Sequence, residues 1–477
     1  MEGESMKNCR GGEWQFGAAI LATLVFLYTG VATGAEVSSG APSPQTEEEV
    51  PQKPPETPPT PAAFLPSSSL FWVTPYFPFI SGTAGPSTGI LAPYGNSMAT
   101  DSLARGSQTH RLGPLGVTPY LEYDEIYRTN IYETSNDKKS DFVNTITDGI
   151  RFDLPIEGKH QLSFGYLGSA YLYSRYENQD HYDQNFNADA ALNFNRMDMR
   201  FGSALRLATE EENAQIVSPR QYTRFTPYYS VGYKFADVWK IEGNYQFDDL
   251  SFTKNVNQID NYTDNLMGWT LFYKFLPKTS AFLQYSVDWR THPYYSINDN
   301  VTHNASLGLQ WDPTAKITGS VKFGYNVADY DHDVPGRNNA PGGLAFSMQT
   351  IYKYSRDTNV SLVAQRSIQE NSDFNNNGYT NTGFILTGNH IFDYFKVSSY
   401  AAFAYYNDNY VGSSFNPGTG TYQARIDNTI SAGAGLSRPL TKWLRLRLDY
   451  LYNNRGSTLT GQSYNEHLVS LGAQASF

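Results

Sequence analysis

Apolar and polar side chains alternate along most of the chain from residue 115 onward. In the stretch WKIEGNYQFD at 239–248, the aromatic and aliphatic residues share one parity with a glycine, and the charged and amide residues share the other. The stretches 316–327 and 444–453 show the same alternation. Because successive side chains of a strand point to opposite faces, this period predicts strands with one apolar and one polar face.

Eighteen such segments follow one another, and the connections between them alternate in length. The short connections include 195–196, 312–314, 356–357 and 439–440, and the long polar ones include 129–139, 210–219, 332–341, 410–419 and 456–462. Short turns on one side and long loops on the other are typical of a barrel that crosses a membrane. The predicted strands are 115–128, 140–154, 159–176, 180–194, 196–209, 220–235, 238–253, 261–275, 279–293, 299–312, 315–331, 342–355, 358–371, 378–392, 394–409, 420–437, 441–455 and 463–477.

We therefore predict an all-β fold, a transmembrane antiparallel up-and-down β-barrel of about 18 strands, with 16 or 20 as alternatives. Residues 115–477 divided by eighteen strands leave about 20 residues for each strand with its connection. This is enough for the roughly 9–11 residues that a strand needs to span the hydrocarbon. Lipid leaves no backbone group unpaired, so a sheet inside it has to close on itself. A soluble propeller would need four short strands in each repeat, whereas this repeat contains two long ones.

The residues before the predicted barrel divide into three parts. Residues 1–35 combine a short positive region, an apolar run and small residues, which predicts a signal peptide. Residues 36–66 are rich in proline and glutamate and predict a disordered linker. Residues 67–114 include the proline-broken apolar stretch FWVTPYFPFI and predict an irregular segment that plugs the lumen or binds a partner. Residues 115–477 are then an outer-membrane β-barrel, located in the Gram-negative cell outer membrane after signal-peptide cleavage.

Composition agrees with this organisation once the alternation is taken into account. A mean hydropathy of −0.48 and a net charge of −11 would suit a soluble protein, but a barrel needs apolar residues only at alternate positions. The single cysteine, Cys9, lies in the predicted signal peptide. We therefore expect neither disulfides nor a thiolate metal site after cleavage.

The last predicted strand keeps its apolar parity to its end. Its outward-facing residues are Val469, Leu471, Ala473, Ala475 and Phe477. This pattern resembles the signal that the outer-membrane insertion machinery of Gram-negative bacteria recognises. That barrel-insertion machinery and outer-membrane lipid are therefore the expected partners of the chain.

Several stretches carry a resemblance to a known family. They are SDFVNTITDGIRFDLPIEGKHQLSFGYLGSAYLYSRY, SAFLQYSVDWR, GLQWDPTAKITGSVKFGYN and TNVSLVAQRSIQENS. Over about 140–477 the chain resembles the family named Putative beta-barrel porin 2, and the WDPTAKITG turn is its most recognisable piece. The resemblance implies an outer-membrane barrel, and some members are similar to export pores found with exopolysaccharide or capsule synthesis. It supplies no catalytic motif.

The sequence contains no signature of catalysis, of a cofactor or of nucleic-acid binding. Its histidines are scattered, and neither an H-E-x-x-H nor a C-x-x-C-H motif occurs. We therefore predict a protein that is not an enzyme and holds no cofactor. The one weak metal candidate is an acidic run whose alternate oxygen ligands suit calcium, although a solvated loop is the better explanation: Asp329, Asp331 and Asp333.

The inward parity places charges of both signs in the lumen. They are Lys240, Lys274, Lys322, Lys353, Arg200, Arg206, Arg445, Arg447, Asp189, Asp198, Glu242, Asp288, Asp427 and Asp449. Mixed signs argue against a simple anion or cation filter and favour ion-paired wall residues. A second interpretation uses inward aromatic rings, whose faces would stack on sugars: Tyr171, Tyr228, Phe282, Tyr400 and Tyr406.

The predicted function is an outer-membrane channel, with polysaccharide export as the first hypothesis. A general diffusion porin for small hydrophilic solutes is the alternative. A third hypothesis is a scaffold or sleeve for a periplasmic partner, and a barrel hydrolase is the weakest because no nucleophile and base can be assigned. Export would add periplasmic polysaccharide-export components as partners.

Overall fold

The computed structural model describes residues 110–476, apart from 158, 215, 217, 312–315, 334–339, 370–377 and 417. All of these lie in the unit Ala63–Phe477. The predicted signal peptide, the predicted linker and residues 67–109 lie outside the described residues. Their roles stay predictions.

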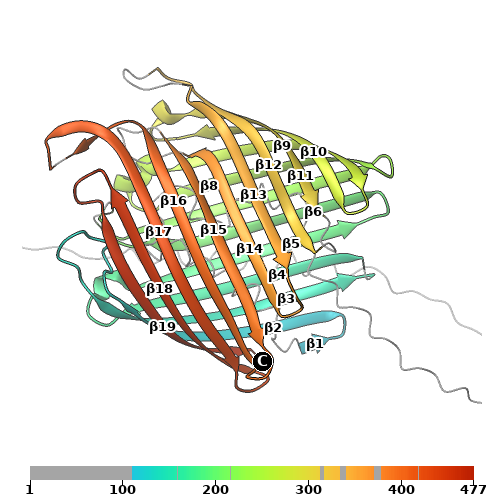
Figure 1. Cartoon of the computed structure of the whole chain (residues 1–477), viewed down its shortest axis with the longest axis horizontal. Coiled ribbons are helices and arrows are strands. Elements are labelled where there is room, and N and C mark those ends of the chain that lie inside the picture. The colour runs from blue at the N-terminus through green and yellow to red at the C-terminus, as the bar shows by residue number, and fades with distance from the viewer. Residues whose placement is uncertain are drawn as a thin grey trace, which may run out of the picture. The chain divides into compact units, whose positions relative to one another are not determined.

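Eighteen long strands form one closed antiparallel sheet (Figure 1). Strands β2 to β18 each pair with the next one, and β19 pairs with β2, where Leu468 lies opposite Arg128. Closure leaves no strand edge in the hydrocarbon and confirms the predicted barrel. The strands are β1 (His110–Leu112), β2 (Leu115–Arg128), β3 (Asp141–Ile156), β4 (His160–Tyr173), β5 (His181–Asn193), β6 (Met197–Glu210), β7 (Arg220–Lys234), β8 (Trp239–Phe252), β9 (Tyr262–Leu276), β10 (Thr279–Thr291), β11 (Asn300–Trp311), β12 (Ile317–Tyr330), β13 (Gly342–Lys353), β14 (Thr358–Gln369), β15 (Tyr379–Phe392), β16 (Val397–Asn416), β17 (Thr421–Pro439), β18 (Leu444–Ser457) and β19 (Tyr464–Ser476).

Among the described residues, three short 3₁₀ helices lie in long connections on the loop side of the barrel. They are η3 (Glu177–Gln179), η4 (Asn255–Asp260) and η5 (Ser296–Asn298). No helix among the described residues has the length and hydropathy needed to cross a membrane.

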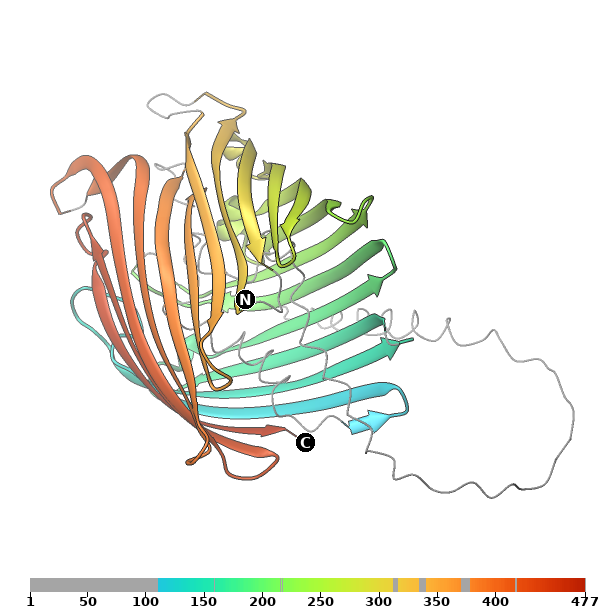
Figure 2. The ribbon, with the colours of Figure 1, turned by 45° about the vertical axis from the view of Figure 1, so that its right-hand side comes forward.

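A short strand, β1, lies in the segment predicted to be irregular. It pairs antiparallel with the start of β2, with His110 opposite Val117, and Gly113 adopts a φ of 64° in the turn. Glycine reaches this left-handed region at little steric cost, so the Gly113–Pro114 pair reverses the chain here. β1 and the end of the chain marked C lie at the same end of the barrel (Figure 2).

The hairpin of β16 and β17 is longer than predicted and projects beyond its neighbours (Figures 1 and 2). The predicted loop 410–419 is mostly strand, because β16 runs to Asn416 and β17 begins at Thr421. Pairing shifts after Asn409 and resumes with Ser413 opposite Ala424, and Gly412 between them has a φ of 95°. A bulge of this kind interrupts the alternation of side chains, which is why the period-two pattern stops short of it.

The outer surface of the barrel is apolar between two aromatic layers. Leu307 and Phe323, directly opposite each other on β11 and β12, are both 63% exposed. Beside the short turns, the rings of Trp239 and Tyr273 lie 4.6 Å apart. Toward the long loops, Tyr hydroxyls bond outward-facing polar side chains, as Tyr245 does with Asn265 Oδ1 at 2.7 Å. An apolar band with aromatic girdles is the surface that a bilayer requires.

Candidate functional site

The inner face of the sheet carries every charged residue that was predicted to line the lumen. Arg200 Nε donates to Asp189 Oδ1 at 2.7 Å, and Lys240 Nζ lies 2.9 Å from Asp198 and 3.1 Å from Glu242. Charges on the inner face thus neutralise one another within one strand, between adjacent strands and across one intervening strand. The structure describes the position of these residues, whereas their role in transport stays a prediction.

Five further predicted charges lie on the same wall. Arg206 lies 3.9 Å from Asp183 and 5.8 Å from the centre of the Tyr222 ring. Asp288 faces the lumen between β9 and β11, opposite Leu266 and Thr302. Close to the short turns, the inner face carries Lys274, Lys353 and Arg445.

Arg447 is the centre of an ion cluster at the seam where the barrel closes. Its guanidinium lies 2.7 Å from Glu122, 2.8 Å from Asp124 and 2.8 Å from Asp449. Glu122 and Asp124 belong to β2, whereas Arg447 and Asp449 belong to β18, so the cluster reaches across β19. The sequence hypothesis omitted both β2 acids, although their parity within 115–128 already placed them on the inner face.

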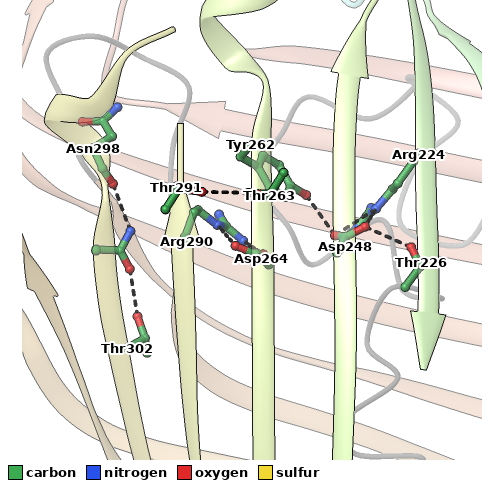
Figure 3. A network of polar contacts seen from close by, with 11 residues as sticks. Arg224, Thr226, Asp248, Tyr262, Thr263, Asp264, Arg290, Thr291, Asn298 and Thr302 are labelled. Atoms are coloured by element: carbon green, nitrogen blue, oxygen red, sulfur yellow. Dashed lines mark hydrogen bonds and ion pairs between the residues drawn. The ribbon is translucent and has the colours of Figure 1, made fainter. Parts of the chain in front are cut away.

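A second network lies on β7 to β10 (Figure 3). Asp248 and Asp264 are direct cross-strand neighbours, an arrangement that repels unless each charge is compensated. Arg224 Nε donates to Asp248 Oδ1 at 2.8 Å, and Arg290 Nε donates to Asp264 Oδ1 at 2.6 Å. Tyr262 lies between the pairs, with its ring centre 4.3 Å from the Arg290 guanidinium. Parity alone would have found all of these residues.

A third ion cluster lies on β17 and β18. Asp427 is fully buried and bonds the guanidinium of Arg425 at 2.8 Å and also that of Arg455. Buried charges persist in proteins when they are paired, and this carboxylate has two arginine partners. The predicted Asp427 is therefore a fixed part of the wall.

The long-loop mouth contains a buried ion pair that fixes a connection inside the barrel. Arg128, at the end of β2, lies 2.8 Å from Glu466 of β19 and 2.8 Å from Glu211 of the β6–β7 connection. Tyr173 Oη also donates to Glu211, at 2.6 Å. The predicted long polar connection 210–219 thus turns inward at its start.

Glu133, in the connection between β2 and β3, is buried beside this ion pair. Burial raises the pKa of its carboxyl group to about 8, and the nearby charge of Glu466 adds to the shift. The positive charges of Arg128 and Arg455 act in the opposite direction. The mouth therefore contains a carboxyl group that stays protonated at neutral pH.

Strands β11 to β15 contrast with the rest of the inner wall. Their described inward-facing positions carry only two charges, Lys322 and Lys353. Lys322 Nζ donates to Gln284 Oε1 at 3.0 Å. The other inward positions, which we call the neutral arc, are mostly amides, hydroxyls and small residues, among them Thr302, Ser306, Gln310, Gln349, Gln365 and Asn381.

The predicted aromatic residues also lie on the inner face, but they pack into the wall. The Tyr171 ring stacks on His181 at 4.6 Å, Tyr228 lies over Gly202, and Tyr400 Oη donates to Asp449 at 2.9 Å. Phe282 and Tyr406 are 6% and 4% exposed, so neither ring presents an open face to a solute. Stacking on a glycan stays a prediction for the other three residues.

Two further predicted sets lie away from the lumen wall. Val469 and Leu471 are exposed on the outer face, Ala473 and Ala475 share their parity, and Phe477 lies outside the described residues. The described part of the chain contains no group of three His, Cys, Asp or Glu residues able to hold a metal ion. The weak candidate does not form such a group because Asp329 faces outward from β12, opposite Val301, whereas Asp331 and Asp333 follow the strand.

A family model described as Putative beta-barrel porin 2 matches residues 106–477. The chain belongs to this family. As a beta-barrel porin 2 protein with a closed sheet and an apolar outer band, it is a porin-like channel of the outer membrane. No curated protein matches its sequence.

Several solved structures are similar to this beta-barrel porin 2 chain at low identity. Acinetobacter baumannii OccAB4 is 13% identical over 78% of this chain and 99% of its own, with a TM-score of 0.41. Pseudomonas aeruginosa OpdK is 10% identical over 76% and 99%, with a TM-score of 0.41. The FrpB iron transporter of Neisseria meningitidis is 8% identical over 79% and 82%, with a TM-score of 0.41. These likenesses say nothing about what this chain transports.

Proposed function

We propose that the barrel is a passive channel for hydrophilic solutes that does not select by the sign of their charge. The observation that carries this proposal is the pairing of charges along the wall. Arg200 with Asp189, Arg224 with Asp248 and Arg290 with Asp264 each cancel locally. Selectivity filters instead use rings of one sign. A wall of matched pairs remains wet and polar without attracting one class of ion.

The more specific proposal is that the solutes are rich in hydroxyl groups, with an exported polysaccharide as the first candidate. The neutral arc supports this, because amides and hydroxyls both donate and accept hydrogen bonds, as sugar hydroxyls do. Family resemblance to export pores supports the polymer in particular. A general diffusion porin for small solutes remains the alternative.

The channel proposal is tested with the full-length mature protein in planar lipid bilayers. We expect steady conductance and a reversal potential close to zero in a salt gradient, because the paired wall has no net preference. Strong selectivity for anions or cations would contradict the proposal. Absence of conductance would also contradict it and would favour the scaffold hypothesis.

The polysaccharide proposal is tested in cells that lack this chain. Loss of surface polysaccharide with unchanged uptake of small solutes supports export. Reduced uptake of small solutes with unchanged surface polysaccharide contradicts export and supports the general porin. A variant that leaves the outer surface intact but disrupts the wall, Arg224→Leu with Arg290→Leu, should reproduce the deletion if the lumen is the route.

A further inference from the structure

One continuous row of inward-facing positions crosses the wall at the start of the neutral arc. Cross-strand pairing links Asn244 of β8 to Gly268, then to Ser286, Asn304 and Asn326 of β12. Adjacent strands lie about 4.8 Å apart, so the row offers polar groups at strand spacing around the inside of the barrel, with a gap at Gly268. We call Asn244, Asn304 and Asn326 the amide row.

The amide row differs from the row on its short-turn side in how its side chains are bonded. The Oδ1 atoms of Asn244, Asn304 and Asn326 are buried and have no hydrogen-bond partner. In the next row toward the short turns, Gln284 Nε2 donates to Thr270 Oγ1 at 3.1 Å and Ser306 Oγ lies 3.5 Å from Gln284. Buried polar atoms are nearly always satisfied in folded proteins, so three unsatisfied acceptors on one row call for a donor from outside the wall.

Two glycines shape the wall along the amide row. Asn244 lies across Gly268, where an added Cβ would stand 2.7 Å from Asn244 Oδ1. Next to Asn326 the row continues to Gly343 of β13, where an added Cβ would meet no atom within 4 Å. The wall is therefore open at Gly343, directly beside an unsatisfied amide oxygen.

We propose that the amide row is a weak binding site for an uncharged, hydroxyl-rich solute, a saccharide, that passes through the lumen. Sugar hydroxyls would donate to the three amide oxygens, and no charged group has to lose its water. The open space at Gly343 would admit part of a sugar ring. This inference rests on the proposed channel function and adds to it a location and a ligand class.

The test uses the full-length mature protein in planar bilayers with linear glucose oligosaccharides as the probe. We expect the wild type to show reversible, concentration-dependent block of the ion current. In the double variant Asn304→Leu, Asn326→Leu the apparent affinity should fall about tenfold or more, because two hydrogen bonds are lost. The matched control Gln310→Leu, Gln349→Leu removes two amides elsewhere in the neutral arc and should retain the block.

The possible outcomes separate this inference from the channel proposal. A wild type that conducts ions but shows no block overturns the inference and leaves the channel intact, whereas absence of conductance overturns the channel itself. Equal loss of block in both double variants also overturns the inference, since the effect is then not specific to the amide row. If the leucine variant does not fold, the double variant Asn304→Ser, Asn326→Ser takes its place. We expect the same tenfold loss of apparent affinity. Unchanged block would count against the site.

Discussion

Glu133 is a carboxyl group in surroundings that oppose its charge. It lies in the connection after β2 with a φ of 49°, an uncommon conformation for a side chain of this type. Its burial and its proximity to Glu466 raise its pKa from 4.5 to about 8. At neutral pH it therefore remains a neutral member of the cluster around Arg128.

The raised pKa of Glu133 predicts a loss of barrel stability with increasing pH. A group whose folded pKa exceeds its unfolded value contributes stability that is complete below about pH 4.5 and disappears as the pH rises through about 8. The loss in this window is at most about 1.4 kcal/mol for each pH unit. Thermal unfolding in detergent at pH 6 and pH 9 measures it, and Glu133→Gln should flatten the dependence. Exposed Glu157, in a short turn, provides the control Glu157→Gln, and an equal flattening there would contradict the assignment.

Parity assigns a residue to one face of the sheet, but it does not identify the partner of that residue. Lys240 was placed in the lumen by its alternation with Trp239 and Ile241, and the structure places it there. Its bond to Asp198 joins residues 42 positions apart and depends on the register of β6, β7 and β8, which alternation does not determine. Sequence reasoning therefore predicted the composition of the wall, while the ion pairs required the structure.

The β6–β7 connection shows the same limit for a whole element. Its acidic run, Glu210, Glu211 and Glu212, lies at the start of a connection that the sequence predicts to be long and polar. Closure of the barrel brings Arg128 and Tyr173 to Glu211 from β2 and β4. The inward turn of this connection thus follows from strands far away in the sequence.

Breaking this contact should release the β6–β7 connection from the mouth. In Arg128→Gln the carboxylates of Glu211 and Glu466 lose a shared buried partner, which typically costs about 3–5 kcal/mol. We expect larger, noisier single-channel currents in Arg128→Gln and Glu211→Gln. Exposed Arg356, paired with Asp393 in a short turn, supplies the control Arg356→Gln, for which currents should match the wild type. Unchanged currents in both mouth variants would contradict the role of this ion pair.

At the scale of the whole molecule, closure of the barrel gives the inner wall a charged part and the neutral arc. The strand number and the even count followed from the alternation, because each spanning segment has the length that a bilayer sets. The contrast between charged strands and the neutral arc is also present in the sequence. It becomes a feature of a lumen only when β11 to β15 lie side by side in a ring.

The central claim is that residues of one parity face lipid and residues of the other parity face water, on opposite sides of one closed sheet. Cys9 is the only cysteine in the sequence, so a Cys9→Ser background allows single cysteines at each position from 321 to 326 of β12. In proteoliposomes we expect a membrane-impermeant thiol reagent to modify the even positions, which include Lys322 and Asn326, and to spare the odd ones, which include Phe323. Equal reactivity at even and odd positions would contradict the barrel, its lumen and the proposals built on them.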